Sequence, residues 1–155
     1  MTFIKDLKTG LKYEIEFLKY IDYDKYEQSK GKFKDYDISI YKNDINITYE
    51  IKADFLSYKT HNICIEYECN NKPSGITSTK SNYYGYFIIH NHIYDLYIID
   101  TNIIKSMIKD KKYKKSMLGG DGKRSKFYLF DIHLFKDYLI CQNLTSPQKT
   151  TSPKI

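Results

Sequence analysis

The spacing of apolar and polar positions in the first half of the chain predicts one helix followed by three strands. An apolar stripe at helical spacing predicts a helix over residues 9–21, with Thr9 as its N-cap. Period-two alternation then predicts three strands, over residues 36–41, 45–54 and 62–69. Asn43 and Asp44 are typical of the tight turn that would join the first two strands.

The second half of the chain continues the mixture of strands and helices. Two apolar runs, over residues 83–90 and 93–99, predict a strand pair that turns near Asn91. The remaining elements are a helix, a strand and a short helix, over residues 101–112, 126–132 and 134–139. This order predicts an α/β or α+β fold in which helices flank a mixed β-sheet.

The length of 155 residues suits a single domain with a hydrophobic core of its own. We assign residues 1–142 to this domain. Residues 143–155 are mostly polar and contain prolines, so we expect them to form a disordered tail.

The chain is basic, with 25 Lys and Arg against 19 Asp and Glu and a formal net charge of +6. A positive charge is compatible with a nucleic-acid partner but does not establish one. Lys, Ile, Asn and Tyr are used heavily and Trp is absent, which is typical of a gene from an AT-rich genome. The function therefore has to be inferred from the positions of charged residues rather than from their number.

Cysteine usage and hydropathy favour an intracellular protein without a membrane span. Cys64, Cys69 and Cys141 form no C-x-x-C pair and are odd in number, which argues against a zinc site or a disulfide framework. The first residues lack the apolar segment of a signal peptide, and no apolar run approaches the roughly 20 residues of a membrane span. We expect a protein of the cytoplasm, or of the host nucleus if it is viral, that is not secreted.

Acidic residues on two neighbouring predicted strands suggest a site for a hard cation. Asp37 and Glu50 lie on the first and second strands, and carboxylate oxygens are the ligands that Mg²⁺ prefers. Lys52 follows Glu50 by two residues and so points to the same face of its strand. There a lysine can orient or deprotonate an attacking water, or neutralise charge on a phosphate. This arrangement suits a Mg²⁺-dependent phosphodiesterase.

The position of this acid-x-Lys tripeptide matters more than its sequence, because the pattern occurs four times in the chain. Only the copy that ends at Lys52 lies inside an alternating strand that follows another acidic strand. Glu14 adds a third acid on the apolar stripe of the predicted helix, where it needs a partner or a function. The alternative is a solvated position at the edge of the stripe. Three clustered acids are unfavourable unless a divalent cation or the lysine compensates their charge.

The order of a helix acid, a strand Asp and a strand Glu-x-Lys, here Glu14, Asp37, Glu50 and Lys52, resembles the core of the PD-(D/E)XK nuclease superfamily. The chain is more specifically similar to small nucleases of this superfamily from phages and large DNA viruses. Their extended signature corresponds here to three segments, YEIKAD (49–54), IEYECNNKPSGITSTKSNYYGYF (65–87) and LGGDGKRSKFYLF (118–130). One departure is Tyr36, which precedes Asp37 where the superfamily motif has proline.

The resemblance implies a restriction-endonuclease-like fold and a metal-dependent hydrolysis. Asp37, Glu50 and the backbone carbonyl of Ile51 would bind Mg²⁺, for which Mn²⁺ can substitute. Lys52 would position or activate the water, and Glu14 would contact the metal shell, directly or through water, or help to hold Lys52. Water would attack a phosphodiester in line and leave a 5′-phosphate and a 3′-hydroxyl.

Three further acids are candidates for a supporting role at this site. Asp54 shares the face of Glu50 and Lys52, and it either supports the metal ligands or caps the following turn. Glu66 and Glu68 share one face of the strand over residues 62–69. If that strand lies beside the Glu50 strand, one of them could reach a second metal or Lys52. The alternative for both is a solvated strand face.

A glycine-rich basic segment supplies the candidates for nucleic-acid contact. Lys123, Arg124 and Lys126 lie in this segment, whose glycines let the backbone approach a phosphate. Tyr113 and Tyr128 lie nearby in the sequence and could stack on unpaired bases. Ser74, in the loop after the third strand, could contact a phosphate. The alternatives are a solvated basic loop and an ordinary turn.

We therefore expect a Mg²⁺-dependent endonuclease that hydrolyses DNA, with a structure-selective role like that of a Holliday-junction resolvase in viral or phage DNA metabolism. A short single domain without a sequence-reading module argues against a long recognition site. A homodimer would let two sites cut two strands. Two alternatives stay open: a non-catalytic nucleic-acid-binding or interaction module on the same fold, and a nuclease that acts on RNA or on single-stranded ends.

Overall fold

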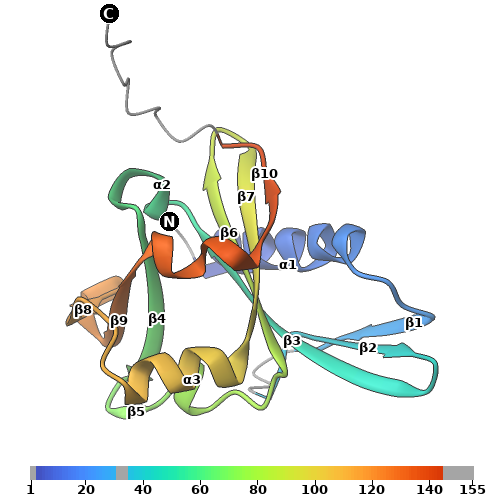
Figure 1. Cartoon of the computed structure of the whole chain (residues 1–155), viewed down its shortest axis with the longest axis horizontal. Coiled ribbons are helices and arrows are strands. Elements are labelled where there is room, and N and C mark those ends of the chain that lie inside the picture. The colour runs from blue at the N-terminus through green and yellow to red at the C-terminus, as the bar shows by residue number, and fades with distance from the viewer. Residues whose placement is uncertain (1–2, 31–34, 145–155) are drawn as a thin grey trace, which may run out of the picture.

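The structure, a computed structural model, describes residues 3–30 and 35–144 of the chain (Figure 1). Within these ranges the helices are α1 (Phe3–Phe17), α2 (Ser57–Thr60) and α3 (Thr101–Lys109), with short 3₁₀ turns η1 (Leu18–Tyr20), η2 (Gly75–Thr77), η3 (Asp121–Lys123) and η4 (Ile132–Tyr138). The strands are β1 (Lys25–Gln28), β2 (Ile38–Lys42), β3 (Ile45–Asp54), β4 (Asn62–Cys69), β5 (Lys72–Pro73), β6 (Tyr83–His90), β7 (Ile93–Asp100), β8 (Lys115–Gly119), β9 (Ser125–Asp131) and β10 (Leu139–Gln142).

These strands form two sheets. The larger sheet has the order β1-β2-β3-β6-β7-β10, in which β3 and β6 are parallel and the other neighbours are antiparallel. The smaller sheet is antiparallel and has the order β5-β4-β9-β8. The parallel pairing places the start of β6 beside the second half of β3, with Glu50 opposite Tyr84.

The larger sheet separates two apolar cores. On one face, Tyr13 and Phe17 of α1 pack against strand residues that include Tyr49 and Phe87. On the other face, β6 and β7 pack with the smaller sheet, α3 and η4. Helices α1 and α3 therefore lie on opposite sides of the larger sheet (Figure 1). The result is a single compact α+β unit with a mixed sheet, as the order of elements predicts.

Gly85 in β6 determines how closely α1 approaches the larger sheet. A Cβ atom at this position would lie 2.6 Å from the Phe17 ring and 2.9 Å from the side chain of Ile51. Any larger residue would therefore displace one of these two side chains. Because Glu14 lies one turn before Phe17 on α1, the same close contact positions the acid of the helix.

Two-residue turns with positive φ angles close three hairpins. The turn residues are Asn43-Asp44, Asn70-Asn71 and Asn91-His92, with φ between 49° and 66°. Such angles define the type I′ turn, whose twist matches that of the strands it joins. The turns predicted at Asn43-Asp44 and near Asn91 are confirmed.

The longer strands agree with the sequence prediction, and the first helix does not. The strands predicted over residues 45–54, 62–69 and 83–90 are confirmed with the same bounds. The predicted start of the first helix is wrong, because α1 begins at Phe3 and Thr9 lies inside it. Among residues 8–17 of this helix, the buried side chains are Tyr13 and Phe17, whereas Leu11 is 39% exposed, so aromatic rings face the sheet over this part of α1.

Four short strands, β1, β5, β8 and β10, escaped the sequence prediction. Their residues are mostly exposed, so no regular apolar alternation marks them. Strand β8 takes up part of the segment predicted as a basic loop and pairs with β9. That segment is therefore largely a hairpin.

The C-terminal boundary differs slightly from the prediction. Residues 145–155, most of the predicted tail, lie outside the described residues. Leu144, which the sequence assigned to the tail, is buried, and its backbone N–H donates to Asp95 Oδ1 at 3.0 Å. In the described ranges, no helix is both long and apolar enough to cross a membrane.

Candidate active site

Strand β3 presents Glu50 and Lys52 on the face opposite its apolar residues. Tyr49 and Ile51 are buried in the core beneath α1, so the alternation of the strand turns Glu50 and Lys52 away from that core. Lys52 Nζ lies 3.2 Å from Glu50 Oε1. The Glu50 side chain is 12% exposed and the Lys52 side chain 38%, so the pair lies at the rim of the interior rather than free in solvent.

Asp37 joins this pair because strand β2 begins only at the next residue, Ile38. The register of β2 and β3 stops at the pair Ile38 and Tyr49. The backbone N–H of Ile51, which lies beyond this pair on β3, therefore has no partner in β2. Asp37 Oδ2 accepts a hydrogen bond from this group, the Ile51 N–H, at 2.7 Å. Its own N–H donates to the Tyr49 carbonyl at 2.9 Å. Both contacts hold the Asp37 carboxylate beside Glu50.

Glu14, on α1, lies near Asp37, Glu50 and Lys52. Gln28 Nε2, at the end of β1, donates to Glu14 Oε2 at 2.5 Å. Burial raises the pKa of the Glu14 carboxyl to about 7, and the negative charges of Asp37 and Glu50 add to this rise. The Gln28 hydrogen bond and the Lys52 charge act in the opposite direction. The charges of Asp37, Glu50 and Lys52 therefore act on the helix acid, which lies near the strand acids.

Neighbouring acids also shift the pKa values of Asp37 and Lys52. Burial, and then the charge of Glu50, raises the pKa of Asp37 to about 6. Burial alone would lower the pKa of Lys52, but the charges of Glu50, Asp37 and Glu66 raise it above its ordinary value. Lys52 is therefore an ammonium ion at neutral pH.

Thr79 fixes the second oxygen of Glu50. Its hydroxyl donates to Glu50 Oε2 at 3.2 Å, and it lies 3.2 Å from the Asp35 carbonyl and 3.0 Å from Ser81 Oγ. Thr79 is buried in the segment that precedes β6. Glu50 is thus held from two sides, by Lys52 and by Thr79.

Tyr84 brings a buried hydroxyl to the cluster. Because Glu50 and Tyr84 are register partners on parallel strands, their side chains share one face of the larger sheet. Burial raises the pKa of Tyr84, and the charges of Glu50, Asp37 and Glu66 add to this effect. The hydroxyl is buried and has no hydrogen-bond partner in the part of the chain that the structure describes.

Glu66 approaches the cluster from the smaller sheet. The condition that the strand of Glu66 pairs with the strand of Glu50 is not met, because β4 pairs with β5 and β9 and not with β3. The chain reverses through α2 between β3 and β4, and Glu66 still lies near enough for its charge to raise the pKa of Lys52. Ser74 Oγ donates to Glu66 Oε2 at 2.5 Å. Ser74 therefore orients an acid of the cluster.

The other two supporting acids have structural partners. Asp54 accepts the backbone N–H groups of Leu56 and Ser57 at 2.8 Å, and also bonds to the hydroxyls of Ser57 and Tyr86. It therefore caps the turn after β3, which is one of the two roles that the sequence allowed. Glu68 forms an ion pair with Lys126 at 2.6 Å, beyond a bulge in β4.

The basic segment lies on the smaller sheet, apart from the acidic cluster. Lys123 and Arg124 are exposed at the turn between β8 and β9, and Lys126 is paired with Glu68. No hydrogen bond or ion pair among the described residues joins any of them to the cluster. The Tyr128 ring, a candidate for base stacking, stacks on Tyr67 at 4.2 Å and contacts Tyr113 at 4.5 Å.

The cluster suits a hard cation held by few protein ligands. Lys52 compensates Glu50, but the hydrogen-bond donors to Asp37 and Glu14 are an uncharged backbone N–H and an uncharged amide. Mg²⁺ commonly binds one or two carboxylates and keeps several waters. Among the described residues, no set of three or more acidic, His or Cys side chains could hold a metal ion. The donors therefore fit a cation held by two carboxylates and water better than a closed cage.

No protein-family model, curated protein or solved structure matches this chain. The structure places Asp37, Glu50 and Lys52 side by side at β3, and Glu14 lies near enough for their charges to act on its pKa. Thr79 and Tyr84 escaped the sequence prediction, since a loop hydroxyl and a strand tyrosine in a chain with 17 tyrosines give no distinctive signal.

Proposed function

We propose that the protein is a Mg²⁺-dependent nuclease that hydrolyses phosphodiester bonds in DNA. One observation carries the proposal: acids from α1, the start of β2 and β3 meet beside the Lys52 ammonium. Acids with raised pKa values beside a fixed positive charge are uncommon in a purely structural role, and they are frequent in active sites. A restriction-endonuclease-like architecture is part of the proposal.

Asp37 and Glu50, with the backbone carbonyl of Ile51, would hold the cation. When bound, Mg²⁺ supplies charge for the phosphate oxygens and lowers the pKa of a water. Glu14 would contact the waters around the cation, with its carboxylate oriented by Gln28. Thr79 would keep Glu50 in place when Lys52 turns towards the substrate.

Lys52 would orient the attacking water and stabilise the negative charge that develops on the scissile phosphate. The charges of Glu50 and Asp37 keep Lys52 protonated in the metal-free site, and removal of a proton from the water is the second role that the sequence leaves open. Attack of the water oxygen in line with the leaving oxygen would break the bond to the 3′ oxygen. The products would be a 5′-phosphate and a 3′-hydroxyl.

The test is an incubation of the protein with supercoiled plasmid, a four-way junction, linear duplex, single-stranded DNA and RNA. Each substrate is combined with Mg²⁺, Mn²⁺ or EDTA. We expect metal-dependent cleavage that falls by about 100-fold or more in Lys52→Ala, because a fixed charge at the reacting phosphate is lost. A preference for the junction would support the resolvase-like role.

The matched control is Glu16→Ala. Glu16 lies on the same helix as Glu14, but it pairs with Lys19 at 2.8 Å and accepts from the Tyr94 hydroxyl at 2.7 Å. Its loss should leave cleavage nearly unchanged. Full activity in Lys52→Ala, or cleavage in EDTA, would overturn the proposal. Folded protein that binds DNA but cuts none of these substrates would favour the non-catalytic module.

A further inference from the structure

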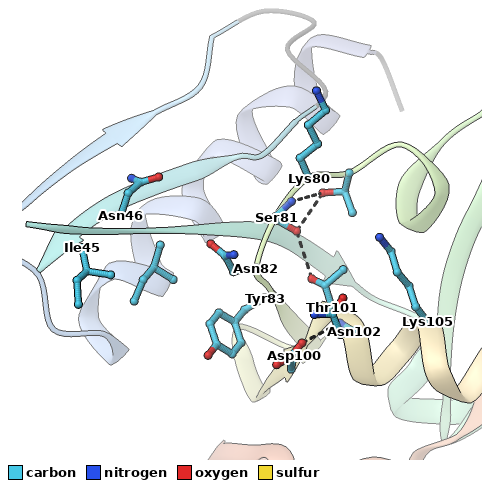
Figure 2. Close-up of a pocket in the computed structure, with 12 residues that line it drawn as sticks. Ile45, Asn46, Lys80, Ser81, Asn82, Tyr83, Asp100, Thr101, Asn102 and Lys105 are labelled. Carbon is cyan, nitrogen blue, oxygen red and sulfur yellow. Dashed lines mark hydrogen bonds between the residues drawn. The ribbon is translucent and has the colours of Figure 1, made fainter.

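A polar pocket of about 480 Å³ lies next to the candidate active site. Figure 2 shows that it is bounded by the start of β3, by the segment that leads into β6, and by the first turn of α3. Asn46 and Asn82 line one side, and Thr101 and Lys105 of α3 line the other.

The pocket and the acidic cluster share a wall. Thr79 lines the pocket, and its hydroxyl is the one that donates to Glu50 Oε2 at 3.2 Å. From Thr79 a row of buried hydroxyls continues along the wall, to Ser81 Oγ at 3.0 Å and on to Thr101 Oγ1 at 3.5 Å (Figure 2). A ligand in the pocket would therefore be separated from Glu50 only by the side chain of Thr79.

The charge around the pocket favours an anion. Lys80 and Lys105 both line it. Lys80 is 75% exposed and lies at a long 3.7 Å from Asp35, so this ion pair is weak. Lys105 is exposed and has no ion-pair partner among the described residues. The one carboxylate in the wall, Asp100, accepts the Asn102 N–H at 2.8 Å as the N-cap of α3.

The volume of the pocket limits the ligand to a small one. A volume of about 480 Å³ falls in the range of pockets for drug-sized molecules, about 300–1,000 Å³. One sugar–phosphate unit is of this size, whereas a base-paired duplex cannot enter. Hydroxyl, amide and ammonium groups in the wall are the donors that proteins use towards the nucleic-acid backbone.

We propose that this pocket binds the sugar–phosphate unit next to the scissile bond of the substrate strand, with Lys105 and Lys80 on its phosphate. The inference rests on the proposed nuclease function, and it specifies the path of the nucleic-acid strand across the protein. The strand would run past Thr79, so that one phosphate lies in the pocket while its neighbour lies at Glu50 and Lys52. The site would then hold a single strand of the nucleic acid in a fixed register.

The test uses a probe of one unit, thymidine 3′,5′-bisphosphate, added to ¹⁵N-labelled protein in EDTA. We expect the backbone amide signals of Thr79, Ser81 and Asn102 to shift with the probe. Unphosphorylated thymidine should cause no comparable shift. Changes centred on the β8–β9 hairpin, or on Glu50 and Lys52 alone, would overturn the proposal.

The variant Lys105→Ala should weaken binding of the probe between about three- and tenfold, because one phosphate contact is lost. Lys109→Ala is the matched control, since Lys109 is also exposed and lies one turn further along α3 but does not line the pocket. Lys105→Arg should retain binding. Equal effects of Lys105→Ala and Lys109→Ala would mean that only the overall charge matters, and would overturn the pocket assignment.

A second measurement separates this inference from the proposed function. Binding of a single-stranded oligonucleotide in EDTA requires neither metal nor cleavage, and Lys105→Ala should reduce the slope of log affinity against log salt by about 0.7. If this holds in a protein that cleaves nothing, the pocket stands and the nuclease proposal fails. If the protein cleaves and Lys105→Ala leaves both binding and KM unchanged, the pocket proposal fails alone.

Discussion

Tyr84 places a buried hydroxyl beside the acidic cluster and gives it no hydrogen-bond partner among the described residues. A buried polar group left unsatisfied costs about 1–3 kcal/mol in the free protein. The cost disappears if the hydroxyl is removed, or if it donates to a phosphate oxygen. In the proposed nuclease, the Tyr84 hydroxyl would donate to the phosphate of the bound substrate.

Tyr84→Phe should therefore make the metal-free protein more stable and the proposed cleavage slower. A gain of about 1 kcal/mol corresponds to a rise of about 2–4 °C in the unfolding temperature of a protein of this size. Thermal unfolding in EDTA and cleavage in Mg²⁺ measure the two effects. The control is Tyr86→Phe, because the Tyr86 hydroxyl donates to Asp54 and accepts the Cys64 N–H at 3.1 Å. That change should lower the unfolding temperature, and a similar fall in Tyr84→Phe would contradict the prediction.

At the scale of elements, the site depends on the distance between α1 and the larger sheet. Phe17 lies over Gly85, and Glu14 is carried by the turn of α1 before Phe17. The strand acids Asp37 and Glu50 are fixed within the sheet by the β2–β3 ladder. The helix acid is therefore the member of the cluster whose position is most sensitive to packing.

Gly85→Ala should displace α1 and reduce both stability and cleavage. Overpacking of this kind costs about 1–3 kcal/mol, and it would also move Glu14 relative to Glu50. Gly10→Ala is the control, because a Cβ at Gly10 meets no atom within 4 Å and Ala favours the helix by about 0.5–1 kcal/mol. Unfolding temperatures and cleavage rates of both variants test the prediction. Equal behaviour of the two would show that the contact between Phe17 and Gly85 does not position the helix.

At the scale of the whole molecule, the acidic cluster makes the stability of the metal-free protein depend on pH. The folded-state pKa values of Glu14, about 7, and Asp37, about 6, lie above their ordinary values. The folded protein therefore binds more protons than the unfolded chain at mildly acid pH. The stability that these protons provide is present at low pH and is lost as the pH rises through 6 to 7.

Glu14→Gln should raise the unfolding temperature at pH 8 by a few degrees, on the order of 1 kcal/mol, and much less at pH 5. Glu16→Gln on the same helix should instead lower it at both pH values, because the hydrogen bond from Lys19, and then that from Tyr94, lowers the pKa of Glu16. Mg²⁺ should stabilise the natural protein more at pH 8 than at pH 5. A Glu14→Gln effect that does not change with pH would show that Glu14 is not strained by its neighbours.

The parts of the fold and the site that the sequence predicts are those that depend on alternation within one strand. Strand β3 is half-buried along its length, so its bounds and the shared face of Glu50 and Lys52 follow from period two. Short exposed strands such as β1 and β8 carry no such signal. The approach of Glu66 and Thr79 to the cluster depends on how the two sheets and a loop pack together, which local pattern does not encode.

The three type I′ turns have a consequence for the composition of the chain. Glycine is the usual residue at positive φ, yet the chain has only 7 glycines and places Asn, Asp or His at these six positions. Asparagine adopts this conformation at a lower cost than other residues with side chains, and its codons are rich in A and T. The hairpins β2–β3, β4–β5 and β6–β7 therefore keep their register without glycine codons. A gene under pressure to lose G and C can preserve the sheet that carries Glu50 and Tyr84.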